Sequence, residues 1–369
     1  MIIKKYTLLS ILTGFSIFLF LFIYLFNIGY ENKNHTSYDS IYYANRVDET
    51  LESTLDDNSL IQTLTTNPIA LNWITIVKIG TIIKNYFGHY WFYGVLIINS
   101  VLFICILFDV SYLDRVLNVS RNNYLTIFVF IGLNLSLIHN ISFINKEIYS
   151  FFFFFRVLRY YLNNNKVSIL LISIFLGLIK IQFFLIGLVC FINLIGFKIR
   201  DIFIIFSLLL SVMYNSSFNI FVPLETYYSR FTYDDIGRSM QIMTTLNDLI
   251  KIPFGYLLVL PLRTLLNLLS GFSVWRLLTV DSFHDFCITF QNLLMAISTI
   301  LLFFRFHRIK YIDTRILNYV FLVFLILGLN TFLQARYFFQ FSILFFIIYQ
   351  SISIKNIQAK FGSVINVNN

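Results

Sequence analysis

Long apolar stretches alternate with short polar segments along the whole chain. About 20 predominantly apolar residues cross the hydrocarbon core of a bilayer as an α-helix, and most of the stretches approach that length. We therefore predict an all-α integral membrane protein with about ten transmembrane helices, forming a single polytopic domain over residues 1–369. The predicted spans are residues 7–29, 90–110, 124–142, 148–162, 167–179, 181–197, 202–221, 287–304, 316–333 and 337–354.

The composition supports the same class of protein. Hydrophobic residues make up 58% of the chain and charged residues 12%, which leaves too little polar surface for a soluble globular protein. We expect residues 7–29 to remain as the first span, because no small-residue cleavage site of a signal peptide follows them.

Basic residues fall in alternate segments between the predicted spans, which indicates the orientation of the chain. Lys and Arg are enriched in cytoplasmic loops, so these segments and both termini are predicted to be cytoplasmic. Two larger loops, about residues 30–89 and 215–286, are then external. The basic segments are residues 4–5, 115–121, 156–166, 198–200, 305–315 and 355–360.

Two apolar segments do not fit a simple span. Residues 252–272 are interrupted by two prolines, an arginine and a glycine, so we predict a re-entrant or interfacial pair of half-helices. Residues 167–197 carry Lys180 near their middle and form either two short, tilted helices or one long helix with Lys180 inside. In the first external loop, residues 70–86 place Lys78 and Lys84 among apolar residues, as in a helix on the bilayer surface.

Ionisable residues inside apolar stretches are the first candidates for function, because a charge near the bilayer centre costs a few kcal/mol. Lys146 and Glu147 adjoin two apolar stretches. Either they form a boundary ion pair, or Lys146 binds an anionic ligand while Glu147 orients it. Lys180 and Arg336 each separate two apolar stretches. The Arg336 guanidinium suits a diphosphate, because it can donate paired hydrogen bonds.

The external loops supply the remaining candidates. Asp39 follows the first span and is either a general base or metal ligand, or the cap of a short helix. Tyr42 in the same segment is a candidate substrate contact. Arg230 and Arg238 lie about two helical turns apart, so both can face a bound anion, or they can pair with nearby acids.

The chain shows neither a phosphate-binding glycine loop nor the spacing of a zinc site, so we expect no cofactor and no bound metal. The three cysteines, Cys105, Cys190 and Cys287, lie in or beside apolar stretches, where we expect buried thiols without disulfides. We expect no nucleic-acid partner.

The external acid, the surface helix, the Lys146–Glu147 pair and the external arginine together resemble a Wzy-type polymerase of O-antigen (lipopolysaccharide) or capsule repeat units. Such polymerases are many-span glycosyltransferases of the bacterial inner membrane, rich in Phe and Ile, and the resemblance covers the organisation of the whole chain. Residues 38–44 (YDSIYYA) also resemble the first-loop acidic motif of GT-C glycosyltransferases, which would give Asp39 a catalytic or metal-binding role.

The resemblance implies polymerisation of undecaprenyl-diphosphate-linked oligosaccharides on the periplasmic side, with the lipid bilayer and a chain-length regulator protein as partners. Arg230, Arg238, Arg336 and Lys180 would hold the leaving diphosphate, and Asp39 or Glu147 would act as base. Two alternatives stay open: a GT-C enzyme with a polyprenyl-phosphate sugar donor, and a flippase or transporter of the lipid-linked glycan.

Overall fold

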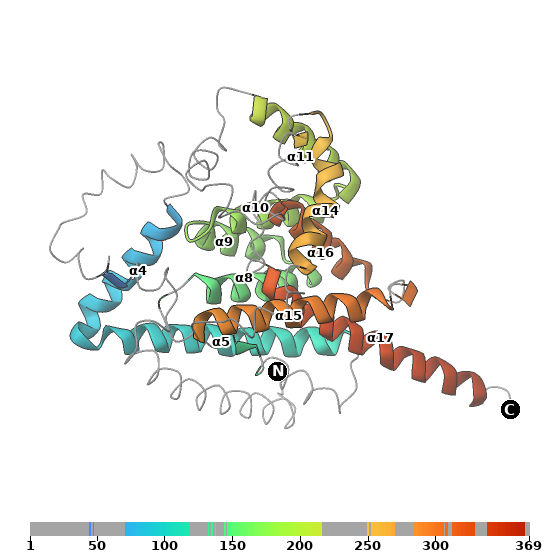
Figure 1. Cartoon of the computed structure of the whole chain (residues 1–369), viewed down its shortest axis with the longest axis horizontal. Coiled ribbons are helices and arrows are strands. Elements are labelled where there is room, and N and C mark those ends of the chain that lie inside the picture. Colours follow the sequence, from blue (N-terminus) through green and yellow to red (C-terminus); the bar gives the residue numbers. More distant parts are fainter. Residues whose placement is uncertain are drawn as a thin grey trace.

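The computed structural model describes the chain in several segments, and every regular element in them is a helix. The all-α prediction is therefore confirmed for the described part. Figure 1 shows the arrangement, with α4 at the left edge of the helical body and α11 at its top. The described residues are 44–45, 47, 71–117, 132, 134–135, 137, 144, 146–215, 249–250, 252–269, 283–305, 307–308, 312–328 and 338–365.

The helices agree with most of the predicted spans in position but differ in length. Two described stretches, Ile74–Val116 and Asp285–Phe303, are long and apolar enough to cross a membrane, so the count of about ten spans stays a prediction. The predicted spans 7–29 and 124–142 lie outside the described residues. The helices are α4 Leu71–Phe87, η2 Gly88–Tyr90, α5 Trp91–Val116, α8 Glu147–Leu162, α9 Lys166–Gly177, α10 Ile181–Leu194, α11 Ile199–Asn215, α14 Gly255–Leu269, α15 Phe283–Phe303, α16 Thr314–Leu327 and α17 Phe339–Ile365.

The stretch Ile74–Val116 is a helical hairpin. Gly88 adopts a φ of 56°, a left-handed conformation that glycine reaches without steric cost, and the short η2 turn follows. The chain folds back so that Gly94 on α5 packs against Ile83 and Phe87 of α4. A helix in the predicted surface segment is thus confirmed, whereas its position on a bilayer surface stays a prediction.

The directions of α5, α8 and α16 follow from the contacts between them. Asn99 and Tyr149 line one pocket, while the Tyr112 hydroxyl, further along α5, donates to Asn163 beyond the end of α8. These contacts make α5 and α8 parallel. The Tyr319 hydroxyl of α16 donates to the carbonyl of Phe154, and Arg315 at its start donates to the carbonyl of Leu162, so α16 runs antiparallel to α8.

The helices α15 and α17 pack along each other in the direction of α5. Gln291 donates to Ser342 near their beginnings, and the Arg305 guanidinium, just after α15, lies over the Tyr349 ring of α17. Ser351 then donates to the Leu117 carbonyl at the end of α5. Five arginines therefore gather at one end of the bundle, which we call the arginine-rich end: Arg115, Arg156, Arg159, Arg305 and Arg315.

The segment around Lys180 forms two short helices, α9 and α10, so the alternative of one long helix is wrong. The chain turns at 178–180, where Lys180 leaves the helical conformation with φ −157° and ψ 112°. Small residues allow close packing, because Gly187 of α10 lies directly against Ser173 of α9. With 12 and 14 residues, the two helices are about 18 and 21 Å long, shorter than a hydrocarbon core of about 30 Å.

The predicted pair of half-helices in residues 252–272 is wrong, because α14 is one helix of 15 residues. Pro253 precedes the helix and so does not interrupt it. Pro261 is the seventh residue of α14, where it lacks a backbone N–H donor without ending the helix. The Tyr256 hydroxyl donates to the carbonyl of Leu325, which places α14 at the end of α16 opposite the arginine-rich end.

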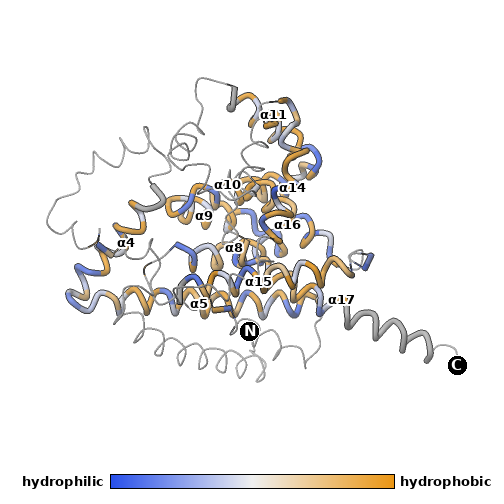
Figure 2. The backbone as a smooth tube through the Cα atoms, in the orientation of Figure 1, coloured by the Kyte–Doolittle hydropathy of each residue, from blue (hydrophilic) through white to orange (hydrophobic). Residues whose placement is uncertain are grey.

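Large apolar side chains on several helices point away from the bundle, at the spacing of a single helix face. The helical body is hydrophobic along most of its length (Figure 2). Polar side chains are buried instead, as on α14, where Arg263, Thr264 and Asn267 face inward and Leu258, Leu262 and Leu265 face outward. Exposed apolar faces also occur on α5 (Tyr93, Ile97, Val101), α9 (Val167, Leu171, Ile174, Phe175, Leu178) and α11 (Ile205, Leu208, Leu209, Val212).

Candidate functional site

Lys180 lies at the tip of the α9–α10 hairpin and is 2% exposed. The flanking turn is held to α4, since the Thr75 hydroxyl donates to the carbonyl of Leu178 at 2.7 Å. The Lys180 ammonium lies 5.4 Å from the centre of the Phe183 ring, a cation–π distance, and Phe183 in turn stacks on Phe153 of α8. A buried ammonium of this kind is costly unless a polar or anionic group meets it.

Lys146 and Glu147 begin α8, because Lys146 is the residue that precedes the helix and Glu147 is its first residue. The carboxylate of Glu147 is therefore in the first turn, where the helix dipole stabilises a negative charge. Glu147 is buried, whereas Lys146 is half-buried. The backbone carbonyl of Lys146 accepts hydrogen bonds from the backbone N–H and the hydroxyl of Ser150, so the first turn is well anchored.

The hairpin tip and the start of α8 meet at the same end of the bundle. The loop at 163–165 joins α8 to α9, and the two helices run back along each other, which brings residue 180 to the level of residue 147. Both positions border one small hydrophobic cluster, in which Ile179 beside Lys180 packs with Ile144 and Tyr149 beside Lys146 and Glu147. Lys146 and Glu147 are adjacent in the sequence, and Lys180 lies 34 and 33 positions after them. The structure thus brings all three candidates to one end of the bundle.

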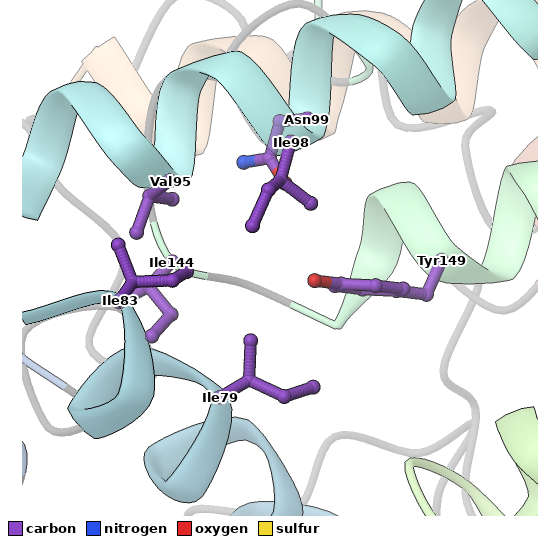
Figure 3. Close-up of a pocket in the computed structure, with 7 residues that line it drawn as sticks. All are labelled: Ile79, Ile83, Val95, Ile98, Asn99, Ile144 and Tyr149. Carbon is purple, nitrogen blue, oxygen red and sulfur yellow. The ribbon is translucent and has the colours of Figure 1, made fainter. Parts of the chain in front are cut away.

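A narrow pocket opens beside this cluster between α4, α5 and α8, with room for about one water molecule. Isoleucine and valine side chains form most of its wall, and Asn99 and Tyr149 supply the polar groups. Figure 3 shows the Tyr149 hydroxyl pointing into the space between Ile79, Ile98 and Ile144. The pocket is too small for a lipid or a sugar, so in this structure it can hold a water molecule between Asn99 and Tyr149.

Arg263 is a buried cation that sequence reasoning treated only as an interruption of an apolar segment. Its side chain is fully buried, and it donates to the carbonyl of Gly328 at 3.1 Å. That carbonyl belongs to the end of α16, where the helix dipole favours a cation. Asn267, one turn further on, donates to the Arg263 backbone carbonyl, so this hydrogen bond lies within α14. The inward direction of this face was not readable from hydropathy.

A second feature missed from the sequence is the ion-pair cluster of Asp109, Arg156 and Arg159 at the arginine-rich end. Both arginines contact the one carboxylate, at 2.7 and 2.8 Å. The sequence signal was present, since Asp109 is the only acidic residue of the predicted span 90–110 and the arginines are three positions apart on α8. These residues lie at the opposite end of α8 from Lys146 and Glu147, so they form a separate site.

Five of the eight candidate site residues lie outside the described residues: Asp39, Tyr42, Arg230, Arg238 and Arg336. Their roles stay predictions. The three cysteines are free, with Cys190 and Cys287 buried and Cys105 half-buried. Within the described segments, no group of three or more His, Cys, Asp or Glu side chains is placed to hold a metal ion.

Comparison of the chain with models of known protein families, with curated proteins and with solved structures finds no match.

Proposed function

We propose that this chain is a multi-pass membrane glycosyltransferase that joins oligosaccharide repeat units carried on a lipid diphosphate into a surface polysaccharide. The observation that carries the proposal is the buried Lys180 ammonium at the tip of a short helical hairpin, level with Glu147 at the start of α8. A buried cation and a buried carboxylate at one end of the bundle are the groups that this reaction needs.

The distribution of side chains supports a location in the membrane. The outward faces of α9, α11 and α14 carry Leu, Ile, Val and Phe in unbroken stripes, whereas Lys180, Arg263 and Asn267 are buried. Contiguous exposed apolar faces of this extent are unfavourable in water but match a lipid environment, where backbone and side-chain polar groups turn inward.

The helix directions support the same proposal. The helices α5, α8, α15 and α17 run toward the arginine-rich end, and α16 runs away from it. This is the order expected if the arginine-rich end is cytoplasmic and the spans alternate as predicted. The α9–α10 hairpin returns to the end where it starts, so it leaves the orientation of later helices unchanged whether or not it crosses the bilayer. Lys180 and Glu147 are then on the external side.

The chemistry of the proposed reaction divides between these groups. An acceptor hydroxyl oxygen attacks the anomeric carbon of the glycan, the bond from that carbon to the diphosphate oxygen breaks, and the hydroxyl proton goes to a carboxylate. Lys180 would stabilise the negative charge that develops on the leaving diphosphate. Glu147 would take the proton or orient the acceptor, sharing this work with Asp39 from the first external loop.

A transporter of the same lipid-linked glycan is the second candidate, because it would also need a buried cation such as Lys180. Transporters often build substrate sites from discontinuous helices near the membrane midplane. The α9–α10 pair is a hairpin and not one interrupted helix, so it shares with such sites only a buried charged residue between two helices of 12 and 14 residues. Polymerase and transporter both require an anion to reach Lys180, so a variant at this residue impairs either one. The chain length of the surface polysaccharide distinguishes them.

The test is the gel profile of surface polysaccharide in cells that lack the chain and in cells that carry variants of it. A polymerase predicts loss of the long-chain ladder while a single repeat unit remains, whereas loss of even the single unit indicates a flippase or an earlier transferase. Lys180→Met should reproduce the deletion profile, and Lys180→Arg should restore part of the ladder. The matched control is Lys198→Met, which removes an exposed lysine at the other end of the hairpin and should leave the ladder unchanged.

A further inference from the structure

The carboxylate of Asp109 holds two guanidinium groups at once. The Nε of Arg156 donates to one carboxylate oxygen at 2.7 Å, and Nη1 of Arg159 donates to the other at 2.8 Å. The Asp109 side chain is fully buried, whereas those of the two arginines are 19% and 27% exposed. The cluster therefore has a closed inner side, formed by the acid, and an outer side formed by guanidinium.

The charges of this cluster do not balance. Two positive groups share one negative group, and both ion pairs of these arginines within the described part of the chain are with Asp109. Arg315 does not change the charge balance of this cluster, because its guanidinium pairs with Asp313 at 2.8 Å. The hydrogen bonds to the Asp313 carboxylate raise the pKa of Arg315 above its ordinary value. One positive charge remains in a largely buried position, where an anion would offset its desolvation.

Donors remain available for such an anion. A guanidinium has five N–H groups, and Arg156 and Arg159 each use one on Asp109. Aromatic rings hold both planes in place: Arg156 lies 5.2 Å from the Phe152 ring centre, and Arg159 lies 5.2 Å from that of Tyr112. The Tyr112 hydroxyl is in turn fixed by Asn163. Two guanidinium forks held by one acid suit the oxygens of a phosphate group.

The position of the cluster indicates what carries that phosphate. It lies at the arginine-rich end of α5 and α8, and the Tyr112 and Tyr160 rings lie against its guanidinium groups, as tyrosines do at a membrane interface. Basic pockets between transmembrane helices at the cytoplasmic side bind the headgroups of anionic lipids. We propose that Arg156 and Arg159, aligned by Asp109, form a binding site for the phosphate of an anionic membrane phospholipid. This site is separate from the proposed catalytic site and requires only that the chain is embedded in a membrane.

The experiment is native mass spectrometry of the full-length protein in detergent, titrated with phosphatidylglycerol, with phosphatidylcholine and with inorganic phosphate. Phosphatidylglycerol should bind more tightly than phosphatidylcholine, and Arg156→Gln or Arg159→Gln should each weaken it about fivefold. Each single variant leaves the buried Asp109 carboxylate one arginine partner. The matched control is Arg200→Gln, which removes an exposed arginine paired with Asp201 and should not alter this binding.

The variant Asp109→Asn separates lipid binding from a purely structural ion pair. The amide keeps the shape and one hydrogen-bond acceptor but removes the competing negative charge, so affinity for phosphatidylglycerol should rise. A structural clamp predicts no gain. Equal affinity of the wild type for both phospholipids, or unchanged binding in the Asp109→Asn variant, would overturn the proposal. Displacement of the lipid by equimolar inorganic phosphate would overturn its lipid part. None of these outcomes depends on glycan chemistry.

Discussion

The packing of the α9–α10 hairpin makes a sharp prediction at Gly187. A Cβ at this position would overlap both the Oγ and the Cβ of Ser173, a buried residue whose hydroxyl donates to the carbonyl of Ile169. Gly187→Ala therefore forces the two helices apart and should destabilise the protein by about 1–3 kcal/mol, the usual cost of overpacking a tight contact. Because the hairpin carries Lys180, the polysaccharide ladder should shorten as well.

A compensating change tests the cause of this loss. Ser173→Gly removes both overlapping atoms, after which the next neighbour of the new Cβ is the Ile169 carbonyl oxygen at 3.6 Å, an ordinary contact. The double variant should recover most of the loss, apart from about 1 kcal/mol for a glycine inside a helix. Thermal unfolding of the purified protein in detergent measures each step. Wild-type stability of Gly187→Ala, or failure of Ser173→Gly to restore it, would refute the proposed packing of the hairpin.

Three further predictions concern the predicted topology and the residues of the external loops. Asp39→Asn should abolish chain extension with normal membrane insertion if Asp39 is a base or metal ligand, and it should be nearly silent in the gel profile if Asp39 only caps a helix, because Asn caps as well as Asp. Arg336→Lys should impair polymerisation despite its retained charge, since an ammonium cannot donate the paired hydrogen bonds of a guanidinium. If the Arg336→Lys variant makes full-length polysaccharide at normal abundance, Arg336 does not bind the diphosphate through paired hydrogen bonds. Arg308→Cys should resist an impermeant thiol reagent in intact cells, because the segment after α15 is predicted to be cytoplasmic; external labelling there would contradict the predicted topology, with the arginine-rich end in the cytoplasm.

Hydropathy located most of the described helices but not all of their ends, since α5 continues to Val116 and α17 to Ile365, beyond the predicted spans. The start of α8 at Glu147 and the break at Lys180 fall where charged residues interrupt such runs. Proline was a poorer guide. Pro261 was predicted to divide a segment, but helical packing on both sides keeps α14 continuous through it.

The contacts between helices could not be predicted from the same pattern. The pairing of Asp109 with Arg156 joins residues 47 positions apart, and it depends on α5 and α8 being parallel neighbours. Local periodicity contains no information about which helices are neighbours. Similarly, the burial of Arg263 depends on the end of α16 meeting α14, a contact across 65 positions. The sequence predicted the adjacent pair Lys146 and Glu147 and, separately, Lys180, and the packing of α8 against α9 and α10 brings them to one end of the bundle.

The most direct test of the central claim is polymerisation by the purified full-length chain in liposomes. The substrate is the lipid-linked repeat unit extracted from cells that lack the chain, and the products are separated by gel electrophoresis and identified by mass spectrometry. Our account predicts glycans of two and more repeat units from the wild type, and single units only from Lys180→Met at equal protein content. Single units alone from a folded wild-type protein that still binds this lipid would contradict it.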